Sequence, residues 1–220
     1  MKKMSAVYVA VCLALASCST NTPTVVKDTQ TDQKITLIDD SKIPWITLTP
    51  GIRYKENGNE TQFDINYTLL NSEYSAAIDE KIDSLSKVDK EVWLDLASSI
   101  KSDVIHNQSI GGQKGELTAQ ATDCSPQNVR ALPTSPDAGA KAFSAGTCKS
   151  TATGGRLEGK TTARAGSDYQ EPCNDSGFTV QCSSVAYGTS SCYSSAELFD
   201  YNAFGYILWQ RRAANPYCSL

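Results

Sequence analysis

The stretch IRYKENGNETQFDINYTL, residues 52–69, predicts a β-hairpin. Its Asn57-Gly58 pair is the strongest short signal for a hairpin turn, because both turn positions need positive φ. After the turn, apolar and polar residues alternate, which gives one buried and one solvated strand face. The apolar positions are Phe63, Ile65, Tyr67 and Leu69. Residues 45–54 are also rich in β-forming side chains, so we expect paired strands at 45–54 and 61–70.

The periodicity changes after residue 70. Apolar residues then recur every three or four positions, which predicts two amphipathic helices. The first apolar stripe is Tyr74, Ile78, Ile82 and Leu85, and the second is Val92 or Trp93, Leu96, Ile100 and Val104. Asp89 is the expected N-cap of the second helix, and Gly111-Gly112 is expected to end it.

Beyond Gly112 the chain is rich in small and polar residues. Segments 115–121 and 159–165 share glycine, threonine and two alanines in register, and we expect both to be strands of one sheet. Residues 125–140 contain three prolines, which predicts a loop. A further strand is expected at 178–182.

The stretch 195–213 carries conflicting signals. Ser194 and Glu197 match a capping box, and Asn215-Pro216 would end a helix. Against a helix, the aromatic and β-branched residues at 204–209 favour a strand, and Gly205 weakens a helix by about 1 kcal/mol. We favour the helix and keep the strand as the alternative.

These patterns predict an α+β fold. Residues 35–110 would supply a hairpin and two helices. Residues 111–220 would form a disulfide-stabilised, β-rich region with a terminal helix. The two regions could share one core.

The N-terminus has the pattern of a secretory leader. Lys2 and Lys3 precede an apolar run that ends in Leu15-Ala16-Ser17-Cys18. This ending resembles the lipobox of bacterial lipoproteins. The resemblance implies cleavage after residue 17, a diacylglycerol and a further palmitate-type acyl chain on Cys18, and a membrane-anchored protein. The rival interpretations are a transmembrane helix, for which the run is short, and an ordinary leader cut elsewhere.

The residues after Cys18 refine the expected location. Residues 18–34 are polar and lack periodicity, which predicts a lipidated flexible tether. Ser19 follows the cysteine, where aspartate would favour retention at the inner membrane of Gram-negative bacteria. The resemblance therefore implies the outer membrane, facing the periplasm or the cell surface.

Six of the eight cysteines remain once Cys12 leaves with the leader and Cys18 carries lipid. An even number in an exported chain predicts disulfides, although sequence cannot choose among the connectivities. We expect the local set Cys124–Cys148, Cys173–Cys182 and Cys192–Cys218. A structural zinc site is the rival, but the spacings contain no C-x-x-C.

The formal net charge is −4, which argues against nucleic acid as a partner. A basic stripe nevertheless occurs within residues 141–166, where five basic residues accompany the acid Glu158. They are Lys141, Lys149, Arg156, Lys160 and Arg164. The stripe could face an anionic polymer or lipid head groups, or it could be a solvated strand face.

No sequence motif identifies a reaction. Residues 154–161 match the spacing of a phosphate-binding loop, but no buried strand precedes them, and their alternation is that of a half-exposed strand. His106 is the single histidine, and Asp103 lies one helical turn before it. The two could therefore ligate a metal from one face of the helix. A capping or surface role is the simpler interpretation of His106. We expect no catalytic, cofactor-binding or metal-binding residues.

We therefore favour a non-catalytic envelope lipoprotein that binds a protein or envelope partner. One alternative is a carbohydrate- or peptidoglycan-binding module, suggested by the basic stripe and by the tyrosines of the second half. These are Tyr169, Tyr187, Tyr193, Tyr201, Tyr206 and Tyr217. The other alternative is a periplasmic hydrolase that uses acidic residues.

Overall fold

The computed structural model describes residues 42–110, 124–133, 139–148 and 156–218, and these residues are mostly β-strand with two helices. The first part contains β1 (Ile46–Thr49), β2 (Ile52–Asn57), β3 (Glu60–Asn66), α1 (Tyr74–Asp83) and α2 (Lys87–Ser109). The second part contains β4 (Cys124–Pro133), β5 (Gly139–Cys148), β6 (Arg156–Ala165), β7 (Asp168–Gly177), β8 (Thr179–Tyr187), β9 (Tyr193–Tyr201) and β10 (Ile207–Asn215). Within these ranges, neither helix has the length and apolar character that a membrane crossing requires.

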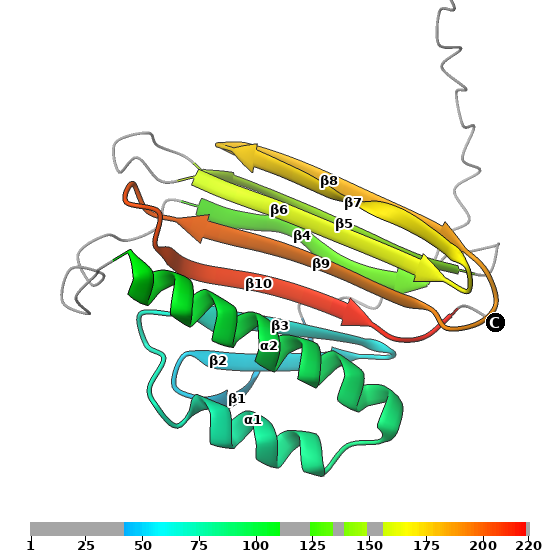
Figure 1. Cartoon of the computed structure of the whole chain (residues 1–220), viewed down its shortest axis with the longest axis horizontal. Coiled ribbons are helices and arrows are strands. Elements are labelled where there is room, and N and C mark those ends of the chain that lie inside the picture. The colour runs from blue at the N-terminus through cyan, green and yellow to red at the C-terminus, as the bar shows by residue number, and fades with distance from the viewer. Residues whose placement is uncertain (1–41, 111–123, 134–138, 149–155, 219–220) are drawn as a thin grey trace, which may run out of the picture. The chain divides into compact units, whose positions relative to one another are not determined.

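The described strands form two antiparallel sheets (Figure 1). The larger sheet has the order β1-β2-β3-β10-β9-β6-β7, and the smaller has the order β4-β5-β8. Strand β10 pairs with β3 on one side and with β9 on the other. The regions 35–110 and 111–220 therefore contribute to one sheet.

Strands β2 and β3 pair around a two-residue turn, Gly58-Asn59, with Asn57 opposite Glu60. The turn lies one residue later than the Asn57-Gly58 turn that the sequence suggested. Gly58 has φ +61° and is the turn residue with positive φ. Glycine at the first central position is the arrangement of a type II′ turn, whose twist matches that of paired strands.

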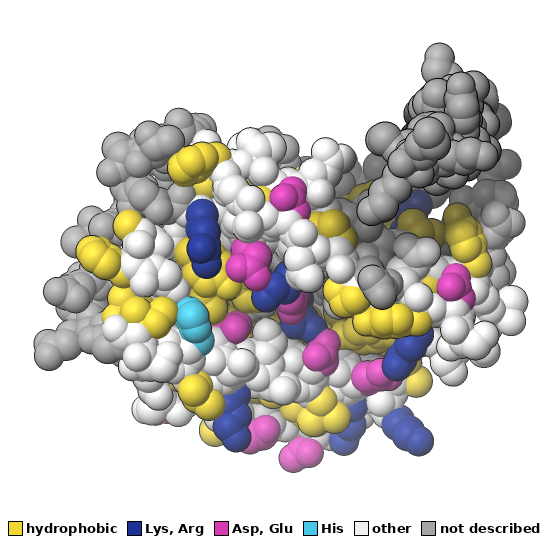
Figure 2. Space-filling model, turned by 45° about the horizontal axis from the view of Figure 1, so that its top comes forward, with side chains coloured by type: hydrophobic (Ala, Val, Ile, Leu, Met, Phe, Trp, Pro, Cys, Tyr) yellow, Lys and Arg dark blue, Asp and Glu magenta, His cyan; other side chains and the backbone are white. Residues whose placement is uncertain are grey.

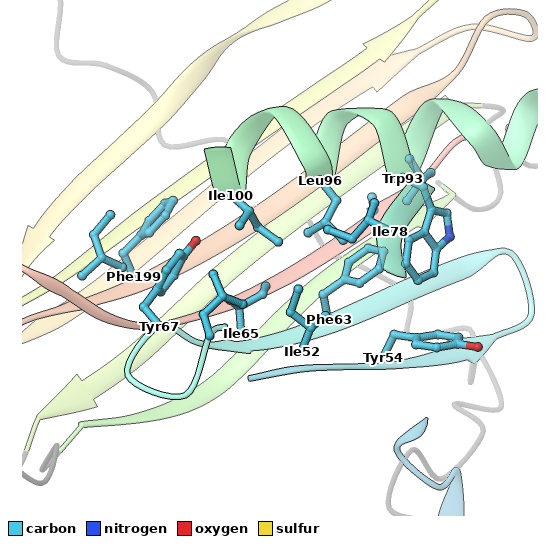
Figure 3. Close-up of a cluster of buried hydrophobic side chains, with 14 of the residues drawn as sticks. Ile52, Tyr54, Phe63, Ile65, Tyr67, Ile78, Trp93, Leu96, Ile100 and Phe199 are labelled. Atoms are coloured by element: carbon cyan, nitrogen blue, oxygen red, sulfur yellow. The ribbon is translucent and has the colours of Figure 1, made fainter. Parts of the chain in front are cut away.

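Helix α2 covers one face of the large sheet. Figure 3 shows three side chains that point from this helix onto the strands, Trp93, Leu96 and Ile100. The Trp93 ring packs edge-on against Tyr54 and Phe63, with centroid separations of 5.1 and 5.0 Å. Each fully buried large apolar side chain stabilises the fold by about 1.5–3 kcal/mol, so this contact holds the helix to the hairpin.

Helix α2 starts one turn before the expected cap. Ser86 is its N-cap, and the Ser86 hydroxyl accepts a hydrogen bond from the backbone N–H of Asp89. Asp89, the predicted cap, is instead the acidic residue of the first turn, where its charge suits the helix dipole.

The small sheet packs on the opposite face of the large one, over β6, β9 and β10. Much of this interface is alanine and glycine, so the sheets approach closely. A Cβ at Gly146 would lie only 2.6 Å from the Leu198 side chain. The buried Glu60 adds a polar link between the sheets, because it accepts hydrogen bonds from Arg130 Nε (2.9 Å) and the Ala131 N–H (2.7 Å). Burial raises the pKa of Glu60 even though Arg130 opposes the shift.

The three disulfides are Cys124–Cys148, Cys173–Cys182 and Cys192–Cys218. The first joins opposed residues of β4 and β5, and the second joins the two sheets at β7 and β8. Asp168 and Asp175 of β7 reinforce that second junction, since each accepts a hydrogen bond from a backbone N–H of β8.

The predicted helix over 195–213 is wrong, because this stretch forms β9, a turn and β10. Successive residues of β9 are buried on opposite faces, Leu198 against the small sheet and Phe199 against the helical layer. Burial on two faces outweighs the local capping signals. Gly205, at φ +86°, lies in the turn, and the Asn202 side chain accepts hydrogen bonds from two backbone N–H groups there.

The predicted loop over 125–140 is also partly wrong. Strand β4 runs through Pro126 to Pro133. It is an edge strand, where a residue without an N–H is tolerated. The strand predicted at 159–165 lies within β6. The strand predicted at 115–121, the leader predicted at 1–17 and the tether predicted at 18–34 lie outside the described residues.

Candidate functional site

A groove runs between α2 and the polar face of β6 and β9. We call it the α2 groove. It consists of two adjoining pockets of about 660 and 420 Å³ that share Asp95, Thr162 and Tyr193. The larger is further lined by Lys87, Lys90, Glu91, Leu94, Arg164 and Tyr169, and the smaller by Ser98, Ser99, Ser102, Ser195, Glu197 and Arg212. Figure 2 shows acidic and basic side chains interleaved across this hollowed face.

The smaller pocket is hollow because short side chains surround it. Asp95, Ser98, Ser99 and Ser102 recur at helical spacing on one side of α2, next to its buried apolar stripe. Thr162 and Ser195 are paired neighbours on β6 and β9 below them. Four hydroxyls of this pocket form no hydrogen bond with any described residue, so each can donate to and accept from a ligand. They belong to Ser98, Ser102, Thr162 and Ser195.

The polar face of β6 runs along the groove. Its alternation was predicted from sequence, and the burial pattern confirms that Leu157, Gly159, Thr161 and Ala163 point inward. Three basic residues of this face lie over aromatic rings of β9. The pairs are Arg156 with Tyr201 (4.9 Å), Lys160 with Phe199 (4.8 Å) and Arg164 with Tyr193 (5.9 Å). Cation–π contacts of this kind hold long basic side chains against the sheet.

An ion network forms the floor of the smaller pocket. The Arg212 side chain is only 3% exposed and bonds both Asp95 of α2 and Glu197 of β9. The Tyr193 hydroxyl donates to the same Asp95 carboxylate. Burial lowers the pKa of Arg212, but Glu197, Tyr193 and Asp95 outweigh it, so the pKa is raised overall and the guanidinium stays charged.

A second polar contact lies deeper along α2. The Tyr67 hydroxyl is 2.5 Å from Asp103 Oδ2 and 2.8 Å from Oε1 of the buried Gln210. Burial raises the pKa of Asp103, while the Tyr67 hydrogen bond opposes the shift. Burial and Asp103 together raise the pKa of Tyr67. The hydroxyl therefore remains protonated and donates to the carboxylate.

The raised pKa of Asp103 predicts a pH dependence of stability. From the unfolded-state value of about 3.9 up to the raised value, the folded protein binds more protons than the unfolded one, so stability falls as pH rises. Asp103→Asn removes this titration and keeps an oxygen acceptor for Tyr67. We expect its free energy of unfolding, measured in urea between about pH 4 and 7, to decline less than that of the wild type.

The control is Asp79→Asn, a matched change at an exposed position of α1. It should keep the wild-type slope of stability against pH. If Asp103→Asn also keeps that slope, Asp103 is not the group responsible.

Asp103 and His106, which could have ligated a metal together, have different partners in the structure. His106 Nε2 lies 3.0 Å from the Gly205 carbonyl oxygen, whereas Asp103 contacts Tyr67. Among the described residues, no cluster of His, Cys, Asp or Glu is arranged to hold a metal. The segment that resembled a phosphate loop enters β6 at Arg156, and Lys160 pairs with Glu158 there.

The structure places only some of the sequence-predicted tyrosines and basic-stripe residues in the α2 groove. Tyr169 and Tyr193 line the groove, whereas Tyr201 lies under Arg156 and lines neither pocket. The other three lie elsewhere, with Tyr187 exposed on β8, Tyr206 buried and Tyr217 donating to Asp89. Lys141 belongs to β5 in the small sheet, while Lys149 and the lipidation candidate Cys18 lie outside the described residues.

Two features of the groove were missed from sequence. The serines of α2 recur at helical spacing beside the apolar stripe, and that spacing could have identified a polar wall. Arg212 gave no such signal, because its partners Asp95 and Glu197 are distant in sequence.

No protein-family model matches the chain, and no curated protein or solved structure matches it significantly. Its function is therefore inferred from the geometry of the α2 groove and from the leader that the N-terminal sequence predicts.

Proposed function

We propose that the protein is a lipid-anchored protein of the bacterial envelope that binds a partner in the α2 groove without transforming it. The anchor rests on the Leu15-Ala16-Ser17-Cys18 lipobox, and Ser19 favours the outer membrane. The three disulfides support an oxidising compartment, since stable disulfides are rare in the cytosol.

The α2 groove is the observation that carries the proposed binding role. Its pockets, of about 660 and 420 Å³, fall within the size range of known ligand sites. Its walls present hydroxyls without side-chain partners, two partly exposed rings and several charges. Asp95 and Glu197, the two carboxylates of the smaller pocket, are both held by Arg212, which suits fixed recognition more than proton transfer.

A carbohydrate- or peptidoglycan-binding module is the second candidate. It is favoured by the meeting of aromatic rings and unpaired hydroxyls in one groove, because sugars offer apolar ring faces and many hydroxyl groups. Tyr169 and Tyr193 are the rings that line the larger pocket.

The test uses the full chain expressed with its leader. The first mature residue of membrane-extracted protein should be Cys18, with the added mass of a diacylglycerol. Protein of residues 19–220, which lacks the lipidated cysteine, should be retained by purified envelope fractions, and isolated sacculi are tested separately. Ser102→Trp should weaken this retention at least fivefold, because the indole fills the smaller pocket.

The matched control is Lys101→Trp, a neighbouring exposed position of α2 that does not line the groove. It should bind as the wild type does, with both variants showing wild-type thermal midpoints. Equal retention of all three proteins would exclude the groove as the binding site, and an unmodified Cys18 would exclude the lipid anchor. Retention by sacculi alone would favour the second candidate.

A further inference from the structure

We infer that the α2 groove takes a short peptide with a free carboxylate at one end and a free ammonium group at the other. This inference rests on the proposed function, because it names the ligand class of the same groove. It is carried by the uneven distribution of charge between the two pockets.

The larger pocket favours an anion. It is lined by three basic and two acidic residues. Both acids already have partners, because Glu91 pairs with Arg164 at 3.2 Å and Asp95 pairs with the buried Arg212. Lys87 and Lys90 make no ion pair with any described residue, so their ammonium groups are available. They lie in the first turn of α2, where the helix dipole adds further positive potential.

The smaller pocket favours a cation. Its two carboxylates, Asp95 and Glu197, share the single guanidinium of Arg212, so one negative charge is left unbalanced. The remaining lining is hydroxyl, from Ser98, Ser99, Ser102, Thr162, Tyr193 and Ser195. Hydroxyl and carboxylate oxygens are hydrogen-bond acceptors, which an ammonium group with its three donors can satisfy.

The larger pocket also presents apolar surface beside Lys87 and Lys90. Leu94 is 56% exposed and Tyr169 is 55% exposed, and both line the larger pocket. An apolar side chain of a ligand would cover them and remove their surface from water. A chain with charged ends and an apolar side chain is a peptide, and it matches this lining better than an uncharged glycan does.

The spacing of the two pockets sets the length of the peptide. Lys90 and Ser102 are separated by twelve helical positions, or about 18 Å along the α2 axis. An extended peptide covers about 3.3–3.6 Å per residue, so about five residues would span the distance.

The test is calorimetric titration of the mature chain with the pentapeptide Ala-Ala-Leu-Ala-Ala. The free peptide should bind. N-acetylation and C-amidation should each weaken it by about fivefold, as expected for the loss of a solvent-exposed ion pair. In the double variant Lys87→Glu, Lys90→Glu the penalty for C-amidation should disappear, because the carboxylate has lost its partners.

The control is Lys101→Glu, which reverses one lysine charge on α2 outside the groove. It should keep the full penalty for C-amidation. Failure of the free peptide to bind, equal binding of capped and free peptides, or tighter binding of a chito-oligosaccharide would overturn the inference. If Ser102→Trp still abolishes envelope binding in that case, the groove remains the binding site and only the ligand class is wrong.

Discussion

Arg212→Met is expected to lower the thermal unfolding midpoint by roughly 10 °C. Arg212 is the buried cation that joins Asp95 of α2 to Glu197 of β9. Methionine fills a similar volume but leaves two carboxylates facing each other without their counter-ion. Removing one partner of a buried ion network costs about 3–5 kcal/mol. In a protein of this size, each kcal/mol lowers the midpoint by about 2–4 °C.

The matched control is Arg156→Met on the same sheet. Arg156 is exposed and lies over the Tyr201 ring, so the same substitution should change the midpoint by about 2 °C or less. Circular dichroism melts of the three proteins provide the measurement. A midpoint for Arg212→Met within the range of the control would show that the network contributes little to stability.

Removal of the Cys192–Cys218 disulfide is the second large expected effect. The bond closes a separation of 26 residues that contains β9 and β10. In the chain-entropy model, a loop of this length stabilises by about 3.5 kcal/mol. The paired variant Cys192→Ser, Cys218→Ser should lose that amount in urea unfolding under non-reducing conditions.

The paired variant Cys173→Ser, Cys182→Ser provides the comparison. Its separation is nine residues, for which the same model gives about 2.6 kcal/mol. The Cys192–Cys218 variant should therefore be the less stable of the two. The reverse order would mean that the junction of the two sheets at β7 and β8 matters more than loop length.

Local periodicity predicted the elements whose partners are close in sequence. Phe63 and Ile65 of β3 and the apolar stripe of α2 are buried as predicted. The solvated face predicted for the strand is wrong, because Gln62 and Asp64 are buried as well. The stripe of α2 is informative because the helix buries one side, so burial appears directly as a period of 3.6. The exposed alternation of β6 was visible for the same reason.

The failure at 195–213 has a different cause. Strands β9 and β10 lie in the middle of the large sheet, and the second half of β9 and most of β10 are buried on both faces, so their apolar residues show no simple alternation. Ser194 and Glu197 then imitate a capping box. In the structure, Ser194 is buried and Glu197 bonds Arg212. Neither the burial of Ser194 nor the pairing of Glu197 with Arg212 can be derived from neighbours in sequence.

The groove could be predicted only in parts. The serine spacing of α2 and the basic face of β6 are both present in the sequence, but nothing local places them side by side. Their meeting depends on the pairing of β6 with β9 and on the packing of α2 against β10. These are long-range contacts, which single-sequence patterns do not encode.

The position of β10 has a consequence for how the molecule is made. Synthesis delivers β3 early and β10 last among the described strands, yet β10 fills the gap between β3 and β9. A nascent chain that stops before residue 207 would leave two open strand edges, which are templates for aggregation. Closure of the large sheet therefore has to wait for residues 207–215. A holding chaperone would have its greatest effect while β3 and β9 still lack β10 between them.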